Sequence, residues 1–377
     1  MRIVYVLTTL AVGGTERQVL AIAKRMAARG HVVVVMTLKP GEPDDCATEL
    51  DVVHLDMHKG IASPIVGVRR GTDFLRTFHP DVVHSHNFHG NLLARMMRLF
   101  YRTPRLISTI HNVYEGGWLR MLAYRTTDWL VDRTTAVSGA VAERFASMKA
   151  VGKDECLVLL NGIEVSEFVP DPNRRAAMRA QMGVGNGFVW LTVGRVTAAK
   201  DLQNLLQAFG NVCLSDEHAY LWIAGERPPR ERQRYEHFVA AMPGATKEKV
   251  RRLGLRRDIP ALLDAADGFV LASAWEGMPL ALGEAMAMEK PVVATDVGGV
   301  RELVGDAGVL VPAKDAAALG GAMLVVMRKS PEERAEMGRA ARLRILEDFS
   351  MDAKAKEWEA LYCSVLAHRA PPATVVP

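Results

Sequence analysis

Two glutamates, Glu276 and Glu284, lie on either side of the expected start of a helix. Proline is favoured in the first turn, so Pro279 predicts that the helix begins there, with Glu276 in the preceding loop and Glu284 one to two turns inside. Backbone N–H groups at such a helix start bind anions, for example a diphosphate. Here these groups belong to Gly277, Met278 and Leu280. Glu284, deeper in the helix, suits the vicinal hydroxyls of a ribose.

Two cations, Arg195 and Lys200, follow a predicted strand that ends near Val193. They could be solvated surface side chains, but their loop precedes Asp201, a predicted N-cap of the next helix. A short cationic loop between a strand and a helix favours pairing with phosphate. We therefore expect Arg195 and Lys200 to neutralise negative charge near Glu276.

A second group of polar residues follows the strands of the first half of the chain. Ligands of parallel sheets bind at the carboxyl ends of the strands. Gly13 and Gly14 come after the first strand, and although such pairs are often simple turns, this one would let a phosphate or an acceptor approach the backbone closely. His111 ends another strand, where it serves either as an active-site side chain or as a packed histidine.

His84, His86 and His89 allow two interpretations. Alternate residues of a strand share a face, so His84 and His86 could contribute to a metal site. We favour a polar lining or a packed strand end, because metal sites need specific ligand geometry and the sequence contains no Asp-x-Asp motif. No metal and no cofactor is expected.

Predicted strands alternate with predicted helices twice along the chain, which is typical of α/β domains built on parallel sheets. With 377 residues, two domains are expected. The Pro-rich segment 169–172 is the expected hinge. The expected strands are 2–7, 32–37, 52–55, 81–85, 105–110 and 134–137 in the first half, and 189–193, 220–224, 268–272 and 291–295 in the second.

Composition is that of a folded globular protein, with 49% hydrophobic and 24% charged residues. The net charge of +4 does not indicate nucleic-acid binding. No apolar stretch is long enough to span a bilayer, and Arg2 leads directly into a strand, so we expect a cytoplasmic protein. The cysteines at positions 46, 156, 213 and 363 lack disulfide or zinc spacing and are expected as free thiols.

Taken together, these motifs resemble the retaining glycosyltransferases of family 4, and the resemblance runs nearly end to end. Its residues stand in the family's order: Gly13-Gly14-Thr15-Glu16, Asp81 to His86, Thr109-Ile110-His111, Asn161-Gly162-Ile163, Gly194-Arg195, Lys200, Glu276, Glu284 and Phe349-Ser350. The chain departs from the pattern at Gly225-Glu226-Arg227-Pro228, where Arg227 replaces a glycine.

The resemblance implies the GT-B fold, in which two Rossmann-like, doubly wound parallel-sheet domains face each other across a cleft. Residues 1–163 would form the acceptor-side domain, completed by a C-terminal helix in 351–377, and residues 164–350 the donor-binding domain. It further implies that Glu276 holds the donor sugar, Glu284 the ribose and His111 a sugar hydroxyl. Leu255 and Arg256 would belong to the segment that holds the nucleotide base.

The function implied is transfer of a hexosyl or N-acetylhexosaminyl group, with retention, from a UDP- or GDP-sugar to a glycan or lipid-linked acceptor. Such enzymes serve polysaccharide or glycolipid synthesis at the cell surface. Two alternatives remain open: a nucleotide-sugar epimerase or hydrolase of the same fold, and a non-catalytic nucleotide-sugar binding protein.

Four arginines recur at three- and four-residue steps, at positions 95, 98, 102 and 105, opposite Leu92, Met96 and Leu99. Arg95, Arg98, Arg102 and Arg105 form either the solvated face of an ordinary helix or a basic surface that binds anionic lipid. The second interpretation would place the protein peripherally on the inner face of the plasma membrane.

Overall fold

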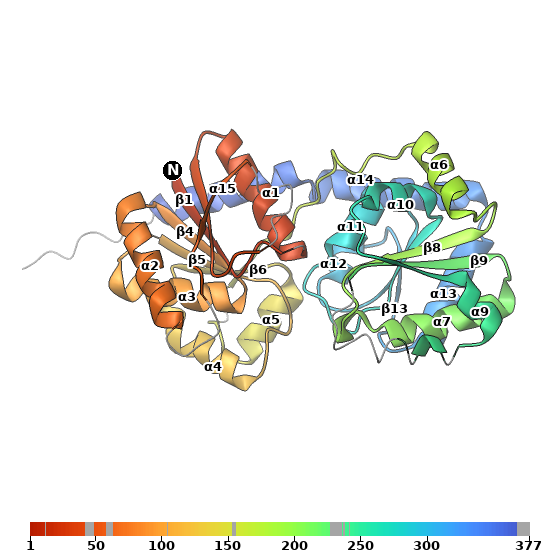
Figure 1. The fold of residues 1–377 in the computed structure, drawn as a ribbon, viewed down its shortest axis with the longest axis horizontal. Helices are drawn as coiled ribbons and strands as arrows, with labels where there is room; N and C mark the ends of the chain where they lie inside the picture. The colour runs from red at the N-terminus through yellow and green to blue at the C-terminus, as the bar shows by residue number, and fades with distance from the viewer. Residues whose placement is uncertain are drawn as a thin grey trace, which may run out of the picture. The chain divides into compact units, whose positions relative to one another are not determined.

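The computed structural model describes residues 1–11, 13–41, 49–57, 63–103, 105–152, 156–226, 236, 238–240 and 242–367. The chain divides into two compact units, Met1–Gly162 with Met351–Pro377 and Ile163–Ser350. Each unit is a parallel β-sheet with helices on both faces (Figure 1). The first unit therefore takes one helix, α15 (Met351–Ala367), from the far end of the sequence.

The first unit contains a seven-stranded sheet in the order β3-β2-β1-β4-β5-β6-β7, and every pair of neighbours is parallel. Its strands are β1 (Arg2–Leu7), β2 (Val32–Thr37), β3 (Asp51–His54), β4 (Val82–His86), β5 (Arg105–Ile110), β6 (Arg133–Ala136) and β7 (Cys156–Val158). Its other helical segments are α1 (Gly14–Ala28), α2 (Ser63–Phe78), α3 (Asn87–Phe100), α4 (Trp118–Thr127), the 3₁₀ turn η2 (Asp128–Leu130) and α5 (Gly139–Ser147).

Strand β1 shows how the sheet is buried from both sides. Because successive side chains of a strand point to opposite faces, Tyr5 and Leu7 pack with α1 and α15. Val4 and Val6 point the other way, into a core that includes side chains of α2 and α3. A strand with two buried faces requires an uninterrupted apolar run, and this is the pattern from which the sequence predicts it.

The second unit contains a six-stranded sheet in the order β10-β9-β8-β11-β12-β13, again parallel throughout. Its strands are β8 (Phe188–Val193), β9 (Ala219–Ala224), β10 (Val250–Gly254), β11 (Gly268–Leu271), β12 (Val292–Thr295) and β13 (Val309–Val311). Its helical segments are α6 (Pro172–Met182), the 3₁₀ turn η3 (Ala198–Lys200), α7 (Leu202–Ser215), α9 (Gly244–Lys249), α10 (Ile259–Ala265), α11 (Leu280–Ala287), α12 (Val300–Val304), α13 (Ala316–Arg328) and α14 (Pro331–Asp348).

Helices cover both faces of this second sheet (Figure 1). On one face Trp190, Val270 and Val293 pack with α7 and α13. On the other face α6 packs against α10, and α11 packs against α14. Strands β8 and β11, whose ends carry the candidate site, are neighbours near the middle of the sheet.

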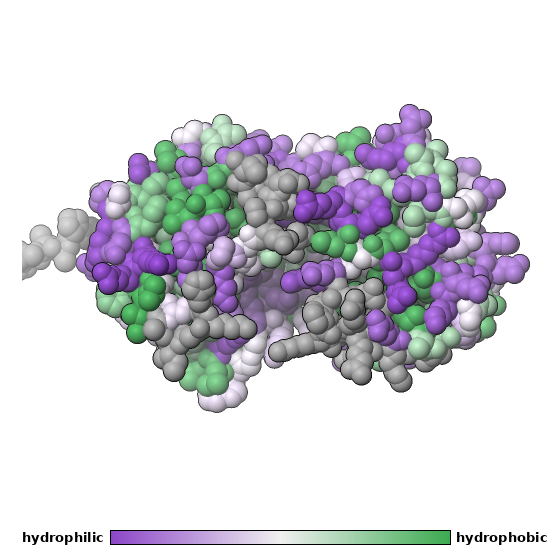
Figure 2. Space-filling model, in the orientation of Figure 1, coloured by the Kyte–Doolittle hydropathy of each residue, from purple (hydrophilic) through white to green (hydrophobic). Residues whose placement is uncertain are grey.

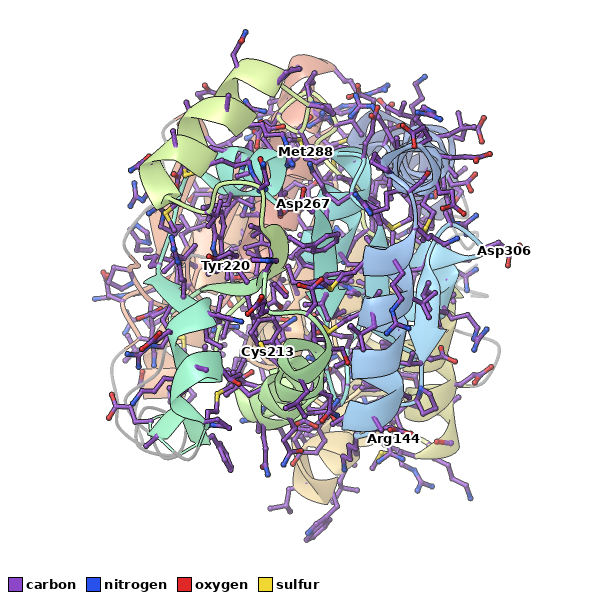
Figure 3. All side chains as sticks on the ribbon, turned by 90° about the vertical axis from the view of Figure 1, so that its right-hand side faces the viewer. Arg144, Cys213, Tyr220, Asp267, Met288 and Asp306 are labelled. Carbon is purple, nitrogen blue, oxygen red and sulfur yellow. The ribbon has the colours of Figure 1, made fainter. Side chains whose placement is uncertain are left out.

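A partly buried carboxylate, that of Asp267, ties α6 to the sheet of the second unit. Asp267, labelled in Figure 3, accepts hydrogen bonds from Arg175 (2.5 Å), Arg179 (2.9 Å) and the backbone N–H of Val189 (2.8 Å). These charge-assisted bonds fix α6 beside the start of β8.

The Pro-rich segment expected as a hinge lies inside the second unit. Pro172 is the first residue of α6, and the side chain of Asp171 caps that helix by accepting from the N–H groups of Asn173 and Arg174. The N–H of Asp171 also donates to Asp264 (3.0 Å). The boundary between the two units falls at Gly162 and Ile163, before this segment, and the proline starts a capped helix.

The edge strands β7, β10 and β13 were not among the expected strands. β7 and β13 contain three residues each, and β10 carries two arginines. Short or charged edge strands lack the apolar runs that reveal central strands.

Candidate functional site

Lys200 and Glu276 form the polar centre of the candidate site in the second unit. Lys200 is the last residue of η3, after β8, and Glu276 lies in the loop between β11 and α11. Lys200 Nζ lies 2.5 Å from Glu276 Oε1, and Ser273 Oγ donates to the same oxygen at 2.6 Å. Because Glu276 is buried, these two donors compensate for the water that its carboxylate loses.

Backbone contacts hold the two loops that carry this ion pair. The N–H of Ala274 donates to Ala199 O at 2.8 Å, which joins the loop after β11 to η3. On the other side of Glu276, Gly298 has φ +54°, and a Cβ there would lie 1.9 Å from Glu276 O. Only glycine fits at this position, so the loop that carries Glu276 is held from both sides.

Three glycines with positive φ stand at the carboxyl ends of β8, β9 and β10: Gly194, Gly225 and Gly254. The N–H of Gly194 donates to Ala224 O (2.9 Å), and that of Gly225 donates to Gly254 O (2.7 Å). A Cβ on Gly225 would lie 1.9 Å from Gly194 O. The chain therefore packs backbone against backbone at this edge, where ligands of parallel sheets bind.

Arg195 follows Gly194 directly and its side chain is exposed. In the part of the chain that the structure describes, Arg195 forms no ion pair, whereas Lys200 is already paired with Glu276. A small cavity of about 20 Å³ borders both cations. A larger one of about 230 Å³, lined in part by Trp275 and Lys314, opens beside them.

Helix α11 begins at Leu280, one residue after the expected start, because Pro279 occupies the N-cap position. Pro279 makes no side-chain cap hydrogen bond. Gly277 and Met278 stand before Pro279. The backbone oxygen of Gly277 accepts from the N–H of Gly299 (2.8 Å), and Met278 is buried. Glu284 lies in the second turn of the helix and is buried, as is Glu276 in the preceding loop.

Leu255 and Arg256 follow β10 at the same edge of the sheet. Arg256 forms a two-pronged ion pair with Asp258, with N···O distances of 2.7 and 2.5 Å. This pair fixes the loop between β10 and α10, and it raises the pKa of Arg256. Leu255 is exposed. The Arg256 side chain is thus occupied by Asp258.

In the first unit, His111 pairs with His86 at the ends of β5 and β4. His86 Nδ1 lies 3.0 Å from His111 Nε2, so one of these nitrogens donates to the other. Burial lowers the pKa of His111 to about 3 and that of His86 well below its usual value. Both rings are therefore neutral near pH 7, and His111 can act as a hydrogen-bonding group rather than as a cation.

Glu115 lies in the loop after His111 and closes the same region. The N–H of His111 donates to Glu115 Oε1 (3.3 Å), and Tyr124 Oη donates to Glu115 Oε2 (2.6 Å). Burial raises the pKa of Glu115 to about 7, although these hydrogen bonds and the nearby Arg120 act in the opposite direction. Glu115 is thus a carboxyl group whose charge changes near neutral pH.

Gly13 and Gly14 mark the start of α1, after β1. Gly13 is the N-cap in an extended conformation, and Gly14 is the first helical residue. A Cβ at Gly13 would lie 2.3 Å from the Glu16 carboxylate, which is a mobile group. The pair therefore stands at a helix N-terminus after a strand, although Val12 lies outside the described residues.

Two known families cover most of the chain. Residues 12–167 match the family described as Glycosyltransferase Family 4, and residues 187–329 match Glycosyl transferases group 1. Glycogen synthase of Mycobacterium tuberculosis is 28% identical over 385 residues, which cover 90% of this chain and 88% of that protein. The UDP-Gal:alpha-D-GlcNAc-diphosphoundecaprenol alpha-1,3-galactosyltransferase of Escherichia coli is 26% identical over 240 residues, or 59% of this chain and 60% of that one.

The fold has solved counterparts as well. HepE of Anabaena, in complex with UDP and glucose, superimposes with a TM-score of 0.85 at 20% identity, over 97% of this chain and 100% of that one. The chain is a glycosyltransferase with the GT-B fold.

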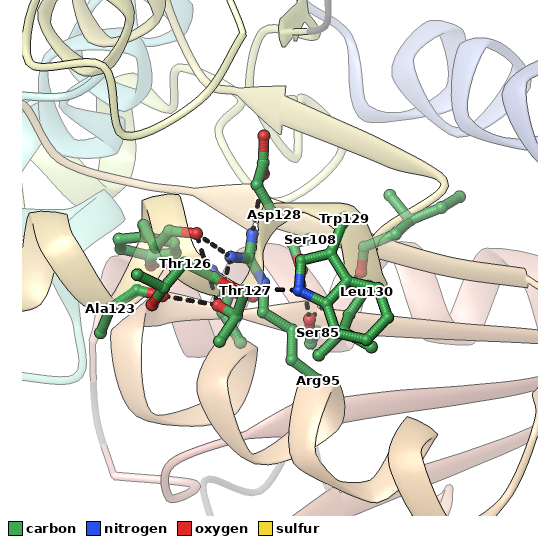
Figure 4. Close-up of polar contacts among 12 residues, drawn as sticks. Ser85, Arg95, Ser108, Ala123, Thr126, Thr127, Asp128, Trp129 and Leu130 are labelled. Carbon is green, nitrogen blue, oxygen red and sulfur yellow. Dashed lines mark hydrogen bonds and ion pairs between the residues drawn. The ribbon is translucent and has the colours of Figure 1, made fainter.

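The arginine pattern of this glycosyltransferase does not form an exposed basic surface. Arg95 is fully buried and donates to Tyr124 O and Thr127 Oγ1, both at 2.9 Å, with Asp128 Oδ1 at 3.5 Å (Figure 4). Burial lowers the pKa of Arg95. The Arg95 guanidinium donates hydrogen bonds to acceptors at the C-terminal end of α4, so Arg95 stabilises the fold of the first unit.

The other arginines of that pattern are mostly engaged too. Arg98 pairs with Asp132 and donates to Leu130 O (3.0 Å), and Arg105 starts β5 and donates to Val365 O (2.5 Å). Of the four arginines, only Arg102 is exposed. Leu99, which was expected on the opposite face, is exposed as well. The expected basic stripe on one helical face is therefore wrong, because α3 ends at Phe100, Arg105 belongs to β5, and Arg95 is buried.

The strand-end histidines of the enzyme are engaged with protein partners. His84 Nδ1 lies 2.8 Å from Tyr362 Oη, and His84 Nε2 lies 2.7 Å from Thr109 Oγ1. His89 is exposed and stacks edge-on against Phe88. Among the described residues, no three His, Cys, Asp or Glu side chains gather as metal ligands would.

Sequence reasoning missed Ser273, Gly298 and Glu115. Ser273 stands three residues before Glu276 at a strand end, a spacing that could have suggested a partner for the glutamate. Glu115 stands four residues after His111, in a loop before two glycines. No sequence signal links Glu115 to Tyr124 or Gly298 to Glu276, because those contacts arise only in the folded chain.

Several expectations concern residues outside the described part of the glycosyltransferase: Cys46, the substitution at Arg227, and the tail beyond Ala367. Within the described part, Cys156, Cys213 and Cys363 are free thiols. Over the same residues, no helix combines the length and apolar character that crossing a membrane requires.

Proposed function

We propose that this enzyme transfers a sugar, with retention of anomeric configuration, from a nucleoside diphosphate sugar to a glycan or lipid-linked acceptor. The observation that carries the proposal is the group formed by Lys200, Glu276 and Ser273 beside the exposed Arg195. It combines cations for a diphosphate with a buried carboxylate for sugar hydroxyls at the ligand-binding edge of a parallel sheet.

Arg195 and Lys200 would stabilise the diphosphate as it leaves. Negative charge develops on the leaving phosphate in the transition state, and fixed cations stabilise it without reorganisation. We propose that this electrostatic role makes a divalent metal unnecessary, in agreement with the missing Asp-x-Asp motif. Lys200 would then exchange Glu276 for the phosphate when donor binds.

Glu276 would accept hydrogen bonds from the donor sugar, Glu284 from the ribose, and neutral His111 would hold a sugar hydroxyl. The loop with Leu255 and Arg256 would contact the base through its backbone. Neither glutamate is proposed as a covalent nucleophile. The bond from the anomeric carbon to the phosphate breaks as the acceptor oxygen forms its bond on the same face, and a phosphate oxygen takes the acceptor proton.

Uridine is the proposed nucleoside, since HepE is described in complex with UDP and the Escherichia coli relative is named for UDP-Gal. That relative is also named for a diphosphoundecaprenol acceptor, which supports a lipid-linked acceptor here. A role in polysaccharide or glycolipid synthesis, with the protein acting from the cytoplasm, belongs to the same proposal.

The test is calorimetric titration with UDP and GDP, followed by turnover with UDP-hexoses and UDP-N-acetylhexosamines and lipid-linked acceptors. We expect UDP to bind, and the product to show the anomeric configuration of the donor by nuclear magnetic resonance. Failure of UDP and GDP to bind would overturn the donor assignment, and an inverted product would overturn retention.

A further inference from the structure

The first unit carries a pocket that the donor chemistry leaves unused. It has a volume of about 560 Å³ and lies after β4 and β5, the strands that end at His86 and Ile110. Asn87, His89 and Asn112 contribute polar side chains to its wall, and Phe88 contributes an aromatic ring. Such a mixture of amides, an imidazole and an aromatic ring suits a polyhydroxylated or phosphorylated head group.

The charges around this pocket favour a ligand that is both hydroxylated and anionic. Arg120 lines it, donates to Glu115 O at 2.7 Å and lies 4.7 Å above the Phe88 ring. Partial burial lowers the pKa of His89, and the nearby charges of Arg120 and Lys39 lower it further. Glu115 is the one carboxyl among the lining residues.

Helix α4 leaves the rim of the pocket with an exposed apolar face. Gly117 lines the pocket and is the N-cap of α4. Trp118, Leu119 and Leu122 follow on one side of the helix and are 69%, 63% and 45% exposed. Figure 2 shows apolar side chains on the part of the surface that α4 forms. Three large apolar side chains together on one turn and a half of helix are unusual for a surface that meets only water.

The face changes character along the helix. Beyond Leu122 the exposed side becomes polar at Arg125 and Thr126, and Tyr114, at the pocket itself, is also exposed. Within α4 the exposed apolar side chains therefore lie next to the pocket, whereas Trp129, 75% exposed in η2, stands beyond the far end of the helix. A tryptophan and a tyrosine near cations are typical of sites where a protein meets the boundary between lipid chains and head groups.

We propose that the pocket and the apolar face of α4 together bind a lipid-linked acceptor, with its phosphate and sugar in the pocket and its hydrocarbon chain along Trp118, Leu119 and Leu122. The proposal rests on the proposed function and names its acceptor site. A single amphiphile explains both features, because the apolar face begins where the pocket ends. A free glycan would use the pocket alone, and a protein partner would have no need of it.

The test is calorimetric binding of farnesyl diphosphate to the full chain, compared with inorganic pyrophosphate and with farnesol. Saturating UDP is present throughout, so that phosphate cannot bind in the donor site. We expect farnesyl diphosphate to bind at least tenfold more tightly than pyrophosphate. The Trp118→Ser/Leu122→Ser variant should lose about tenfold in affinity for farnesyl diphosphate and none for pyrophosphate, and Arg120→Gln should weaken both.

Leu214→Ser is the matched control, because Leu214 is an apolar side chain on a helix of the second unit and is even more exposed, at 88%. It should bind every probe as the parent does. Equal binding of farnesyl diphosphate by the parent and the double variant would overturn the proposal. So would equal affinity for farnesyl diphosphate and pyrophosphate, which would point to a soluble acceptor or to a protein on α4. UDP binding by the same variants reports separately on the donor proposal.

Discussion

Lys200 and Glu276 form an ion pair between residues 76 positions apart, with Nζ 2.5 Å from Oε1. The same two residues are the proposed partners of the donor's phosphate and of its sugar. In the structure, which contains no donor, Lys200 is paired with Glu276. Donor binding would exchange one negative partner of Lys200 for another.

This exchange makes opposite predictions for the two residues. Lys200→Ala, like Arg195→Ala, should weaken UDP binding by about 1.5 to 3 kcal/mol, since one charge-assisted contact to phosphate is lost. Glu276→Gln should bind UDP at least as tightly as the parent, because Lys200 no longer has to leave a carboxylate. Its turnover with UDP-sugar should fall steeply.

Calorimetry with UDP and a release assay for nucleotide separate these effects. Ser273→Ala serves as the matched control, because it removes one hydrogen bond to Glu276 without changing charge. Loss of UDP affinity in Glu276→Gln, or unchanged affinity in both cation variants, would move the phosphate site elsewhere.

Gly225 is the backbone position at which the site edge tolerates no side chain. Gly225→Ala should destabilise the protein by about 2 kcal/mol or more, because φ is +154° and the new Cβ would lie 1.9 Å from Gly194 O. Gly210→Ala is the control. Gly210 stands within α7 with open space around it, so this variant should raise the free energy of unfolding by about 0.5 to 1 kcal/mol. Urea unfolding measures both, and a Gly225→Ala variant as stable as the parent would refute the close approach.

Glu115 makes stability depend on pH in a defined direction. Its pKa of about 7 in the folded protein, against 4.5 ordinarily, means that the folded state holds a proton between these values while the unfolded state does not. The parent therefore loses stability as pH rises from about 4.5 to 7, and Glu115→Gln does not. Relative to the parent, the free energy of unfolding of the variant should increase between these pH values, by about 3 kcal/mol at most. The difference should level off above pH 7.

Melting temperatures of the parent and of Glu115→Gln at pH 5 and pH 8 test this dependence. Glu143→Gln, at an exposed position of α5, is the charge-matched control. The lowered pKa values of the buried His84, His86 and His111 reduce stability as pH falls below about 6.5. These histidines are present in the parent and in the variant, so their effect cancels in the difference. A constant difference between parent and Glu115→Gln across the range would contradict the assignment.

Turnover should not depend on divalent metal, since Arg195 and Lys200 would carry the charge that a metal otherwise neutralises. We expect equal rates with a chelator present and with added magnesium or manganese. A chelated enzyme that stops and then recovers on addition of manganese would show that the cations alone are insufficient.

The amino-acid sequence determined the alternation of strands and helices and most strand positions. β1, β2 and β5 are as expected, because uninterrupted β-branched runs reflect strands buried on both faces. Asp201 caps α7 as expected, accepting from the N–H of Asn204, since capping depends on residues that are neighbours in the chain. The edge strands β7, β10 and β13 and the exact start of α11 were harder to predict, because few residues define each of them.

Only the tertiary structure decided which partner each polar side chain meets. Lys200 and Glu276 come together because β8 and β11 are neighbours in the sheet, which places the loops that follow them side by side. Nothing in the local sequence encodes that strand order. Arg95 shows the same limit. Helical spacing put the arginines on one face, yet whether that face is inside depends on the carbonyls of Tyr124 and the carboxylate of Asp128, which only the folded chain brings to them.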